Sequence, residues 1–301
     1  MKPLSVIPTV DSHHHLWDTK DNQYPWLAGP SFDAHFGASG DLPRPYLIEQ
    51  YLADTKNQNI VKSIHVEASY SPDDPVGETK WLQAIADTHG FPHGIVAFAN
   101  LAKPDVRDTL EQHCSFANMR GIRMPTMTPA QLREAKGDIR SKMSEPDWRA
   151  GFKVLSDLDL SYDLQAPAPL MSEAAELAAD FPDTRIFLTH TGLPLDRSEA
   201  GMNAWRQGMK KMSQRDNISV KMTGLPMTDW NWTVESLRPM ILETIDLFGV
   251  NRCMFGSNFP IDGLHSTFDT LFDAFREIVS GFSADEVAAL FHDNAAKGYR
   301  L

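Results

Sequence analysis

The segment DSHHHLWD at residues 11–18 contains three consecutive histidines, a residue type that serves as an acid–base group and as a metal ligand. They could also be part of an affinity tag or a chance surface cluster. A tag normally stands at a terminus beside a linker, whereas these histidines lie between apolar and aromatic residues, so we assign them to the fold. Alternate residues of a strand face the same side, so we expect His13 and His15 to act together while His14 points the other way.

Other reactive side chains recur at the ends of β-rich segments, and the set is Glu67, Arg123, Thr189, His190, Lys221, Ser257, Asn258 and Asp262. His190 stands in LTHTGLP between an apolar strand and a turn, where functional residues are common. Lys221 in SVKMTGLP could be a solvated strand residue, but its apolar neighbours favour an interior, substrate-facing position. Arg123 and Glu67 could bind substrate or equally form an internal ion pair that supports the fold.

The remaining histidines carry no such context. We interpret those at positions 35, 65, 89, 93, 113, 265 and 292 as structural or surface residues.

Eight short β-rich runs alternate with helical patterns along the chain, at 8–13, 61–67, 93–99, 119–124, 160–164, 185–189, 218–222 and 252–257. This alternation predicts a single-domain (β/α)8 barrel of the TIM type over residues 1–301, with the final segment at 283–299 helical. A doubly wound open sheet is the alternative, but the glycine-rich phosphate turn that usually follows its first strand is missing. In a barrel the strand ends meet at one mouth, so the reactive side chains should converge there.

Two stretches interrupt the alternation. Residues 18–45 are rich in proline, glycine and aromatic residues, and we expect this loop to cap the active site and bring Tyr24 and Trp26 to the substrate. Residues 126–144 form a second insertion of undecided helical content. Neither stretch divides the chain into domains.

The composition and charge of the chain argue against several classes of partner. The formal net charge of −12 comes without a Lys/Arg cluster, which argues against nucleic acid as a partner. The sequence contains no signal peptide and no apolar run long enough to span a membrane, so we expect a cytoplasmic protein whose partner is a small molecule. Cys114 and Cys253 have apolar neighbours and are interpreted as buried thiols. The sequence leaves a homo-oligomer open.

Several motifs together carry a resemblance across nearly the whole chain. DSHHHLWD, YPWL, GIRMP, LTHTGLP, VKMTGLP, MFGSNFP and HDNAAKGYRL occur in this order. The chain thereby resembles the amidohydrolase-related lactonases of the amidohydrolase superfamily, a group that includes sugar lactonases and 2-pyrone-4,6-dicarboxylate lactonase. The resemblance implies a distorted (β/α)8 barrel, with His13, His15, His190 and Lys221 in the active site. It also implies a hydrolase that opens a small cyclic ester, carboxylated or sugar-derived.

One position departs from that pattern. Relatives of this group usually have GSDWP after strand eight, where the aspartate is the general base, whereas this chain has GSNFP with Asn258. An amide has no accessible basic form, so Asn258 cannot take a proton from water. We favour a neighbouring group as the substitute base, namely Asp262, His190 or Glu67. Alternatively, Asn258 positions water for a neighbour, or the protein acts on something different.

The same substitution bears on metal binding. His13, His15 and His190 could hold one divalent metal, most plausibly zinc, because three histidines suffice in some catalytic sites. Loss of the carboxylate weakens such a site, so a reaction without any cofactor is equally compatible with the sequence. The alternatives to a lactonase are a metal-dependent decarboxylase or amide hydrolase of the same superfamily, and a non-catalytic barrel that binds a small molecule.

Overall fold

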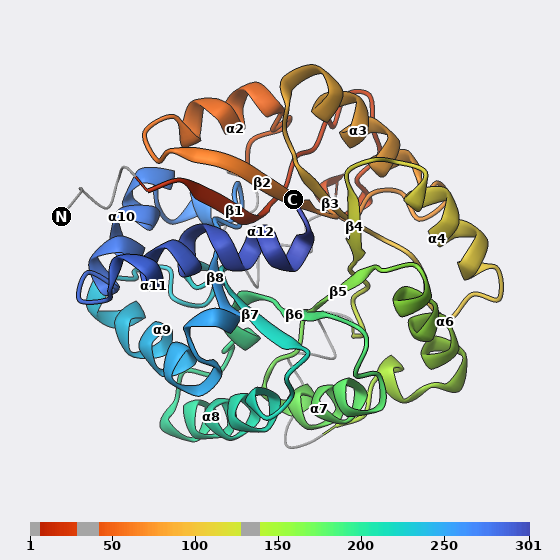
Figure 1. Ribbon diagram of the computed structural model, residues 1–301. Coiled ribbons are helices and arrows are strands. Elements are labelled where there is room, and N and C mark those ends of the chain that lie inside the picture. Colours follow the sequence, from red (N-terminus) through yellow and green to blue (C-terminus); the bar gives the residue numbers. More distant parts are fainter. Residues whose placement is uncertain (1–6, 29–41, 128–138) are drawn as a thin grey trace.

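Eight parallel strands surround a barrel axis in the computed structural model, which describes residues 7–28, 42–127 and 139–301 (Figure 1). The strands are β1 (Thr9–His14), β2 (Ile60–Val66), β3 (Gly94–Ala97), β4 (Met119–Ile122), β5 (Ser161–Leu164), β6 (Ile186–Leu188), β7 (Ile218–Met222) and β8 (Cys253–Phe255). Each strand pairs with the next one in sequence order, from β1 to β8. This order confirms the predicted barrel, because a doubly wound sheet would reverse its strand order part-way.

Backbone hydrogen bonds close the barrel between β1 and the segment that follows β8. The amide of Asn258 donates to the carbonyl oxygen of His13, and the amide of His15 donates to the carbonyl oxygen of Phe259, each at 2.7 Å. His14 and Phe259 also form a parallel bridge. We call this junction the closing seam; it joins the histidine segment directly to Asn258.

All eight predicted strands are present, and the prediction at 218–222 matches β7 in full. The others are shorter or shifted, most clearly the predictions at 93–99 and 252–257. Several predicted strand-end residues therefore lie in the loops just beyond the strands. In a barrel of this type, loops in that position carry the active-site side chains.

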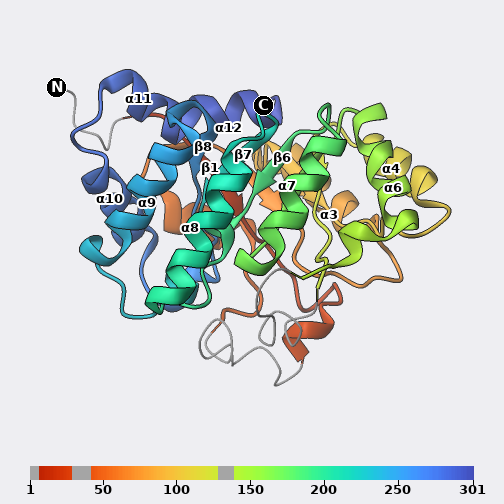
Figure 2. The same cartoon turned by 90° about the horizontal axis from the view of Figure 1, so that it is seen from below.

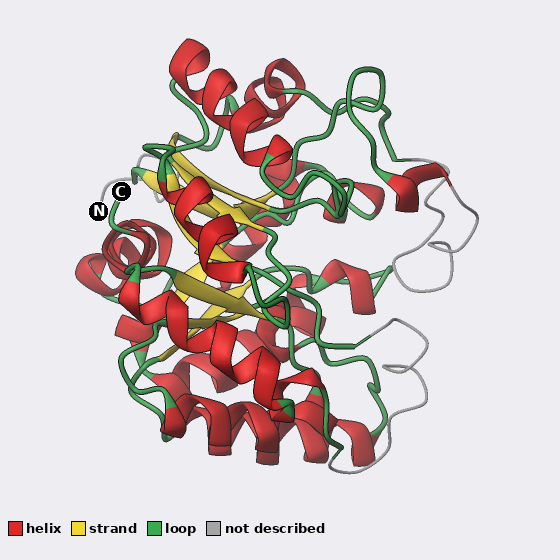
Figure 3. Ribbon diagram, turned by 90° about the vertical axis from the view of Figure 1, so that its right-hand side faces the viewer, coloured by secondary structure: helices red, strands yellow, loops and turns green. Residues whose placement is uncertain are grey.

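Helices pack around the outside of the strands (Figure 3). They are α2 (Ile48–Thr55), α3 (Gly77–His89), α4 (Val106–Cys114), α6 (Pro146–Asp157), α7 (Met171–Asp180), α8 (Glu199–Ser213), α9 (Val234–Phe248), α10 (Phe268–Ile278), α11 (Ala284–Ala288) and α12 (Asn294–Tyr299). The predicted single helical segment at 283–299 contains a π-helical turn at Ala289–Asp293 between α11 and α12. Within the described residues, no helix is long and apolar enough to cross a membrane.

Helix α12 covers the amino-terminal end of the barrel. Tyr299 is fully buried in a cluster with Val10, Val96 and Phe187, and its ring stacks on Phe187 with centroids 4.2 Å apart. Figure 2 shows α12 at one end of the barrel and the short 3-10 helix η2 (Pro25–Ala28, red) at the opposite end. The apolar plug closes one end, so the strand ends at the other end form the accessible mouth.

Some sequence predictions fall outside the described residues, including His35 and most of the insertions at 18–45 and 126–144. The prediction that both cysteines are buried is wrong for one of them. Cys253 is buried in β8 as expected, but Cys114 is exposed, because it occupies the solvent-facing side at the last position of the amphipathic helix α4.

Candidate active site

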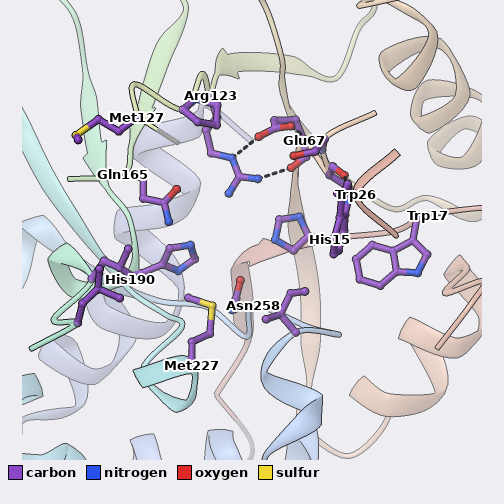
Figure 4. A pocket seen from close by; sticks show the side chains of 16 residues that line it. His15, Trp17, Trp26, Glu67, Arg123, Met127, Gln165, His190, Met227 and Asn258 are labelled. Carbon is purple, nitrogen blue, oxygen red and sulfur yellow. Dashed lines mark hydrogen bonds and ion pairs between the residues drawn. The ribbon is translucent and has the colours of Figure 1, made fainter. Parts of the chain in front are cut away.

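A cavity of about 250 Å³ opens at the carboxyl ends of the strands (Figure 4). Its polar lining residues are His15, Glu67, Ser69, Arg123, Gln165, His190 and Asn258, and its apolar ones are Trp17, Trp26, Ala68, Pro125, Met127, Leu193, Leu195, Met227 and Ile261. All of them belong to segments that follow β1, β2, β4, β5, β6, β7 or β8. Side chains that are distant in sequence therefore meet at one mouth, as the strand-end argument predicted.

His13 and His15 form a close pair beneath the cavity. Their Nε2 atoms are 3.3 Å apart, and His15 Nδ1 lies 2.7 Å from the carbonyl oxygen of Val66. Because a carbonyl only accepts, His15 carries its proton on Nδ1 when neutral, which leaves a lone pair on Nε2. Burial lowers the pKa of both imidazoles well below the usual value, and the nearby cations Lys221 and Arg123 act in the same direction. Both rings are therefore neutral near pH 7.

His14 points away from this pair, as predicted. Its ring stacks on Tyr51 of α2 with centroids 4.1 Å apart, and its Nε2 lies 3.0 Å from Ser63 Oγ. All three histidines are buried in β1 or directly after it, which excludes a tag or a surface cluster. His14 fixes the strand against α2 and takes no part in the cavity.

His190 stands beside the pair, with its ring centroid 4.7 Å from that of His13. Its Nδ1 lies 3.0 Å from Thr223 Oγ1, and burial lowers its pKa well below the usual value. Gly224 allows this approach, since a Cβ there would lie 2.4 Å from His190 Nδ1 and its backbone φ is +62°. His190 itself has a φ of +56°, a left-handed conformation that is unfavourable for non-glycine residues and is enriched at functional sites.

Asn258 faces the cavity between His15 and His190 (Figure 4). Its side-chain amide nitrogen donates to Asp262 Oδ1 at 2.8 Å, which leaves the amide oxygen as its acceptor on the cavity side. Asp262 is fully buried and does not line the cavity. Burial raises the pKa of Asp262 well above the usual value. Because Asp262 bonds to Asn258 and does not line the cavity, it orients Asn258 and is not placed to accept a proton from a water there.

Asp11 anchors the closing seam, a function that sequence analysis missed. Its carboxylate accepts hydrogen bonds from the amide and the hydroxyl of Ser257, both at 2.7 Å, and from Tyr51 Oη at 3.0 Å. The amide of His13 donates to it as well, at 3.2 Å. One buried side chain thus holds the histidine segment, α2 and the loop of Asn258 in a fixed arrangement. The direct neighbourhood of the histidine motif was the available signal.

Arg123 and Glu67 form the internal ion pair that the sequence left open, and both also line the cavity. Arg123 Nε donates to Glu67 Oε1 at 2.7 Å, and its Nη2 donates to the Glu67 carbonyl oxygen at 2.5 Å. The amide of Ser69 donates to the other carboxylate oxygen at 2.7 Å. Guanidinium has five N–H donors, so several remain for a group in the cavity.

Lys221 does not occupy the predicted substrate-facing position. It is fully buried inside the barrel, where its ammonium bonds to Asp163 Oδ2 at 2.7 Å and to Tyr299 Oη at 3.1 Å. Burial lowers its pKa, and the Asp163 carboxylate opposes that shift. The apolar neighbours in the sequence correctly indicated an interior residue, but the ammonium is directed toward the α12 plug and not toward the cavity wall.

Of the two aromatic residues predicted to contact substrate, only one lines the cavity. Trp26 lines the cavity, whereas Tyr24 is buried beside Tyr70, with ring centroids 5.5 Å apart, and is not a lining residue. Gln165 does line the cavity and was missed, although it directly follows the predicted strand at 160–164 and the strand-end rule alone would have found it.

The donor atoms match a divalent metal only in part. Two imidazole ligands of a tetrahedral zinc lie about 3.3 Å apart, which fits the pair His13 and His15. Across the described ranges, however, no group of three or more His, Cys, Asp or Glu is arranged to hold a metal ion. The predicted set with His190 is therefore not assembled, and Asn258 contributes only a neutral oxygen. These residues do not fit a resident metal.

Comparison with known proteins agrees with the fold and with the geometry of the site. The model of the amidohydrolase family Amidohydro_2 matches residues 10–301. The chain belongs to the amidohydrolase family. It is a hydrolase, which confirms the resemblance carried by the sequence motifs.

Individual proteins and solved structures are similar to this chain over nearly its whole length. The chain is 47% identical to the uncharacterized protein y4mH of Sinorhizobium fredii, over 99% of this chain and 100% of the relative. It is 25% identical to an L-fucono-1,5-lactonase of Burkholderia multivorans, over 97% and 96%. An amidohydrolase structure from the same species with bound zinc has a TM-score of 0.82 at 23% identity, covering 98% and 99%. A 5-carboxyvanillate decarboxylase of Sphingomonas paucimobilis also shares the fold, with a TM-score of 0.66, 10% identity and coverage of 98% and 100%.

Proposed function

We propose that this amidohydrolase opens the ring of a small lactone by adding water to its carbonyl carbon. The observation that carries the proposal is the convergence of two neutral imidazoles, His15 and His190, with Asn258 and Arg123 on one small cavity. Ester hydrolysis needs a proton acceptor for water, a donor for the developing oxyanion and a donor for the departing alkoxide. The four residues include a group for each of these three requirements. The 25% identity to an L-fucono-1,5-lactonase supports the reaction class.

The water is held by Asn258 and deprotonated by a histidine. Asn258 Oδ1 accepts one hydrogen bond from the water, because its amide nitrogen is occupied by Asp262. His15 Nε2 takes the other proton, since the Val66 carbonyl keeps the Nδ1 proton in place and then stabilises the imidazolium. His13, 3.3 Å away, shares that proton. The lost carboxylate base is thus replaced by a histidine pair whose tautomer is fixed.

Arg123 acts on the carbonyl oxygen of the lactone, and His190 acts on the leaving group. As water adds, negative charge develops on the carbonyl oxygen, and a free N–H of Arg123 donates to it. The ring C–O bond then breaks, and the imidazolium formed at His15 returns the proton taken from water to the alkoxide, which also accepts a hydrogen bond from neutral His190. A lactone and one water thus give one hydroxy acid, and each histidine ends the cycle neutral.

The two other candidate functions are less well supported. Metal-dependent decarboxylation or amide hydrolysis needs a cation that the described donor set does not fit. A binding barrel without activity would leave the histidine pair and its Val66 partner without a chemical role. If hydrolysis appeared only in an Asn258→Asp variant, that alternative would be supported.

Acid release from a panel of five- and six-membered lactones tests the proposal. The native protein should open at least one of them, and His15→Ala or His190→Ala should lower kcat by about 10²- to 10⁴-fold. His89→Ala, a partly exposed position at the end of α3, serves as the control and should keep native activity. A broad panel without any turnover would remove the proposed function.

A further inference from the structure

The wall of the cavity around the reacting groups is largely apolar. Its lining includes Met127, Leu193, Leu195, Met227 and Ile261 together with two tryptophans. Both indole N–H groups are already used, since Trp17 Nε1 donates to the Pro43 carbonyl oxygen at 2.8 Å and Trp26 Nε1 to that of Ala68 at 2.6 Å. The two tryptophans therefore present carbon surface to a ligand. A hydroxyl placed against this wall would lose its hydrogen bonds to water without replacement.

The described lining of the cavity also carries no net charge. Among its described lining residues, Arg123 and Glu67 are the charged side chains at neutral pH, and they pair at 2.7 Å. The histidines beside them are buried. A carboxylate entering the cavity would be desolvated close to the Glu67 carboxylate, with the Arg123 charge already compensated. The net charge of −12 on the whole chain further disfavours the approach of an anion.

We infer that the substrate is an uncharged lactone that carries an apolar alkyl or aryl substituent. This inference rests on the proposed lactone hydrolysis and departs from the carboxylated or sugar-derived ester that the sequence resemblance implies. The ester group lies against His15, His190 and Asn258, and the substituent lies against Leu195, Met227 and the tryptophans. Among the residues that the structure describes, polar lining groups such as Gln165 and Ser69 are too few to satisfy a polyhydroxylated ring as well as the reacting water.

Four six-membered lactones with the same ring test the inference: δ-valerolactone, δ-decalactone, D-glucono-1,5-lactone and 6-oxotetrahydropyran-2-carboxylate. Each buried methylene should raise kcat/KM about fourfold, so full burial of the five-carbon pentyl group of δ-decalactone should give about 1000-fold over δ-valerolactone. Higher kcat/KM for the polyhydroxylated or the carboxylated lactone would overturn the inference and leave the proposed function standing. Turnover of none of the four would count against the proposed function and remove the inference with it.

A pair of variants tests the same wall without affecting the reacting groups. Leu195 lines the cavity and its residue is 37% exposed, while Val61, at the opposite end of the barrel, is 38% exposed. Leu195→Ser should lower kcat/KM for δ-decalactone about fivefold more than kcat/KM for δ-valerolactone. Val61→Ser should alter neither value. An unchanged ratio of the two substrates in Leu195→Ser would overturn the inference.

Discussion

Replacement of Gly224 by alanine tests how His190 is positioned. Gly224 has a φ of +62°, and an added Cβ would lie 2.4 Å from His190 Nδ1 and 2.6 Å from Met227 Cε. The left-handed backbone costs an alanine about 1–2 kcal/mol. Overpacking of this kind typically adds about 1–3 kcal/mol. Together these contributions predict a loss of about 2–5 kcal/mol in the free energy of unfolding, measured by urea denaturation.

The same contact predicts a loss of activity. Ordinary van der Waals contact begins near 3.4 Å, so the His190 ring must move by about 1 Å to make room for the methyl group. A misplacement of 1 Å at a catalytic group costs about 100-fold, so kcat for lactone opening should fall by that factor.

Gly90 provides a matched control for the backbone alone. It caps the end of α3 with a φ of +75°, and an added Cβ there would meet nothing within 4 Å. Gly90→Ala should therefore lose only the backbone contribution of about 1–2 kcal/mol and keep native kcat. If Gly224→Ala lost no more stability than Gly90→Ala and kept kcat within twofold, the close packing of Gly224 on His190 would be refuted as a requirement of the site.

Three further predictions concern the charge states of the site. Asn258→Asp should bind zinc at least about tenfold more tightly than the native protein in calorimetry at pH 7, because a carboxylate joins the two converging imidazoles; equal affinity would contradict the donor-set argument. Burial raises the pKa of Asp11 from 3.8 to about 6, so the folded state binds this proton more tightly than the unfolded chain does. As the pH rises from 4 to 6, the native protein should therefore lose on the order of 2 kcal/mol of unfolding free energy relative to Asp11→Asn, whereas parallel pH curves would show that Asp11 ionises normally. Lys221→Met should lose about 3–5 kcal/mol of stability, because it leaves Asp163 buried without its partner, and Lys221→Met combined with Asp163→Asn should recover part of it. A stable Lys221→Met variant with a raised KM would instead favour the substrate contact that the sequence suggested.

The barrel and the main polar lining of the cavity could be predicted because they depend on local patterns. Alternation of apolar runs gives the strands, and residues just after them, such as Glu67, Arg123 and His190, must meet at the mouth whatever the packing details. Within β1, the period of two was sufficient to separate His13 and His15 from His14.

The direction of individual side chains depended on partners from distant segments. Lys221 has interior neighbours whether it faces the cavity or the plug, and only the distant Asp163 and Tyr299 decide between the two. Asp262 follows Asn258 by one helical turn, but its raised pKa results from complete burial, which the sequence FPIDGLH does not disclose. Tyr24 and Trp26 lie two residues apart in the same loop, and packing against Tyr70 separates their positions.

The closing seam also has a consequence for the order of folding. Asp11 and Ser257 are 246 residues apart in sequence, so their hydrogen bonds form only after nearly the whole chain has collapsed into place. Such distant contacts carry the full entropy of loop closure and arise late compared with neighbouring strand pairs. During refolding, native-like secondary structure should therefore precede the return of catalysis. A circular permutation that makes the two strands consecutive would turn the seam into a local contact and bring the two events together in time.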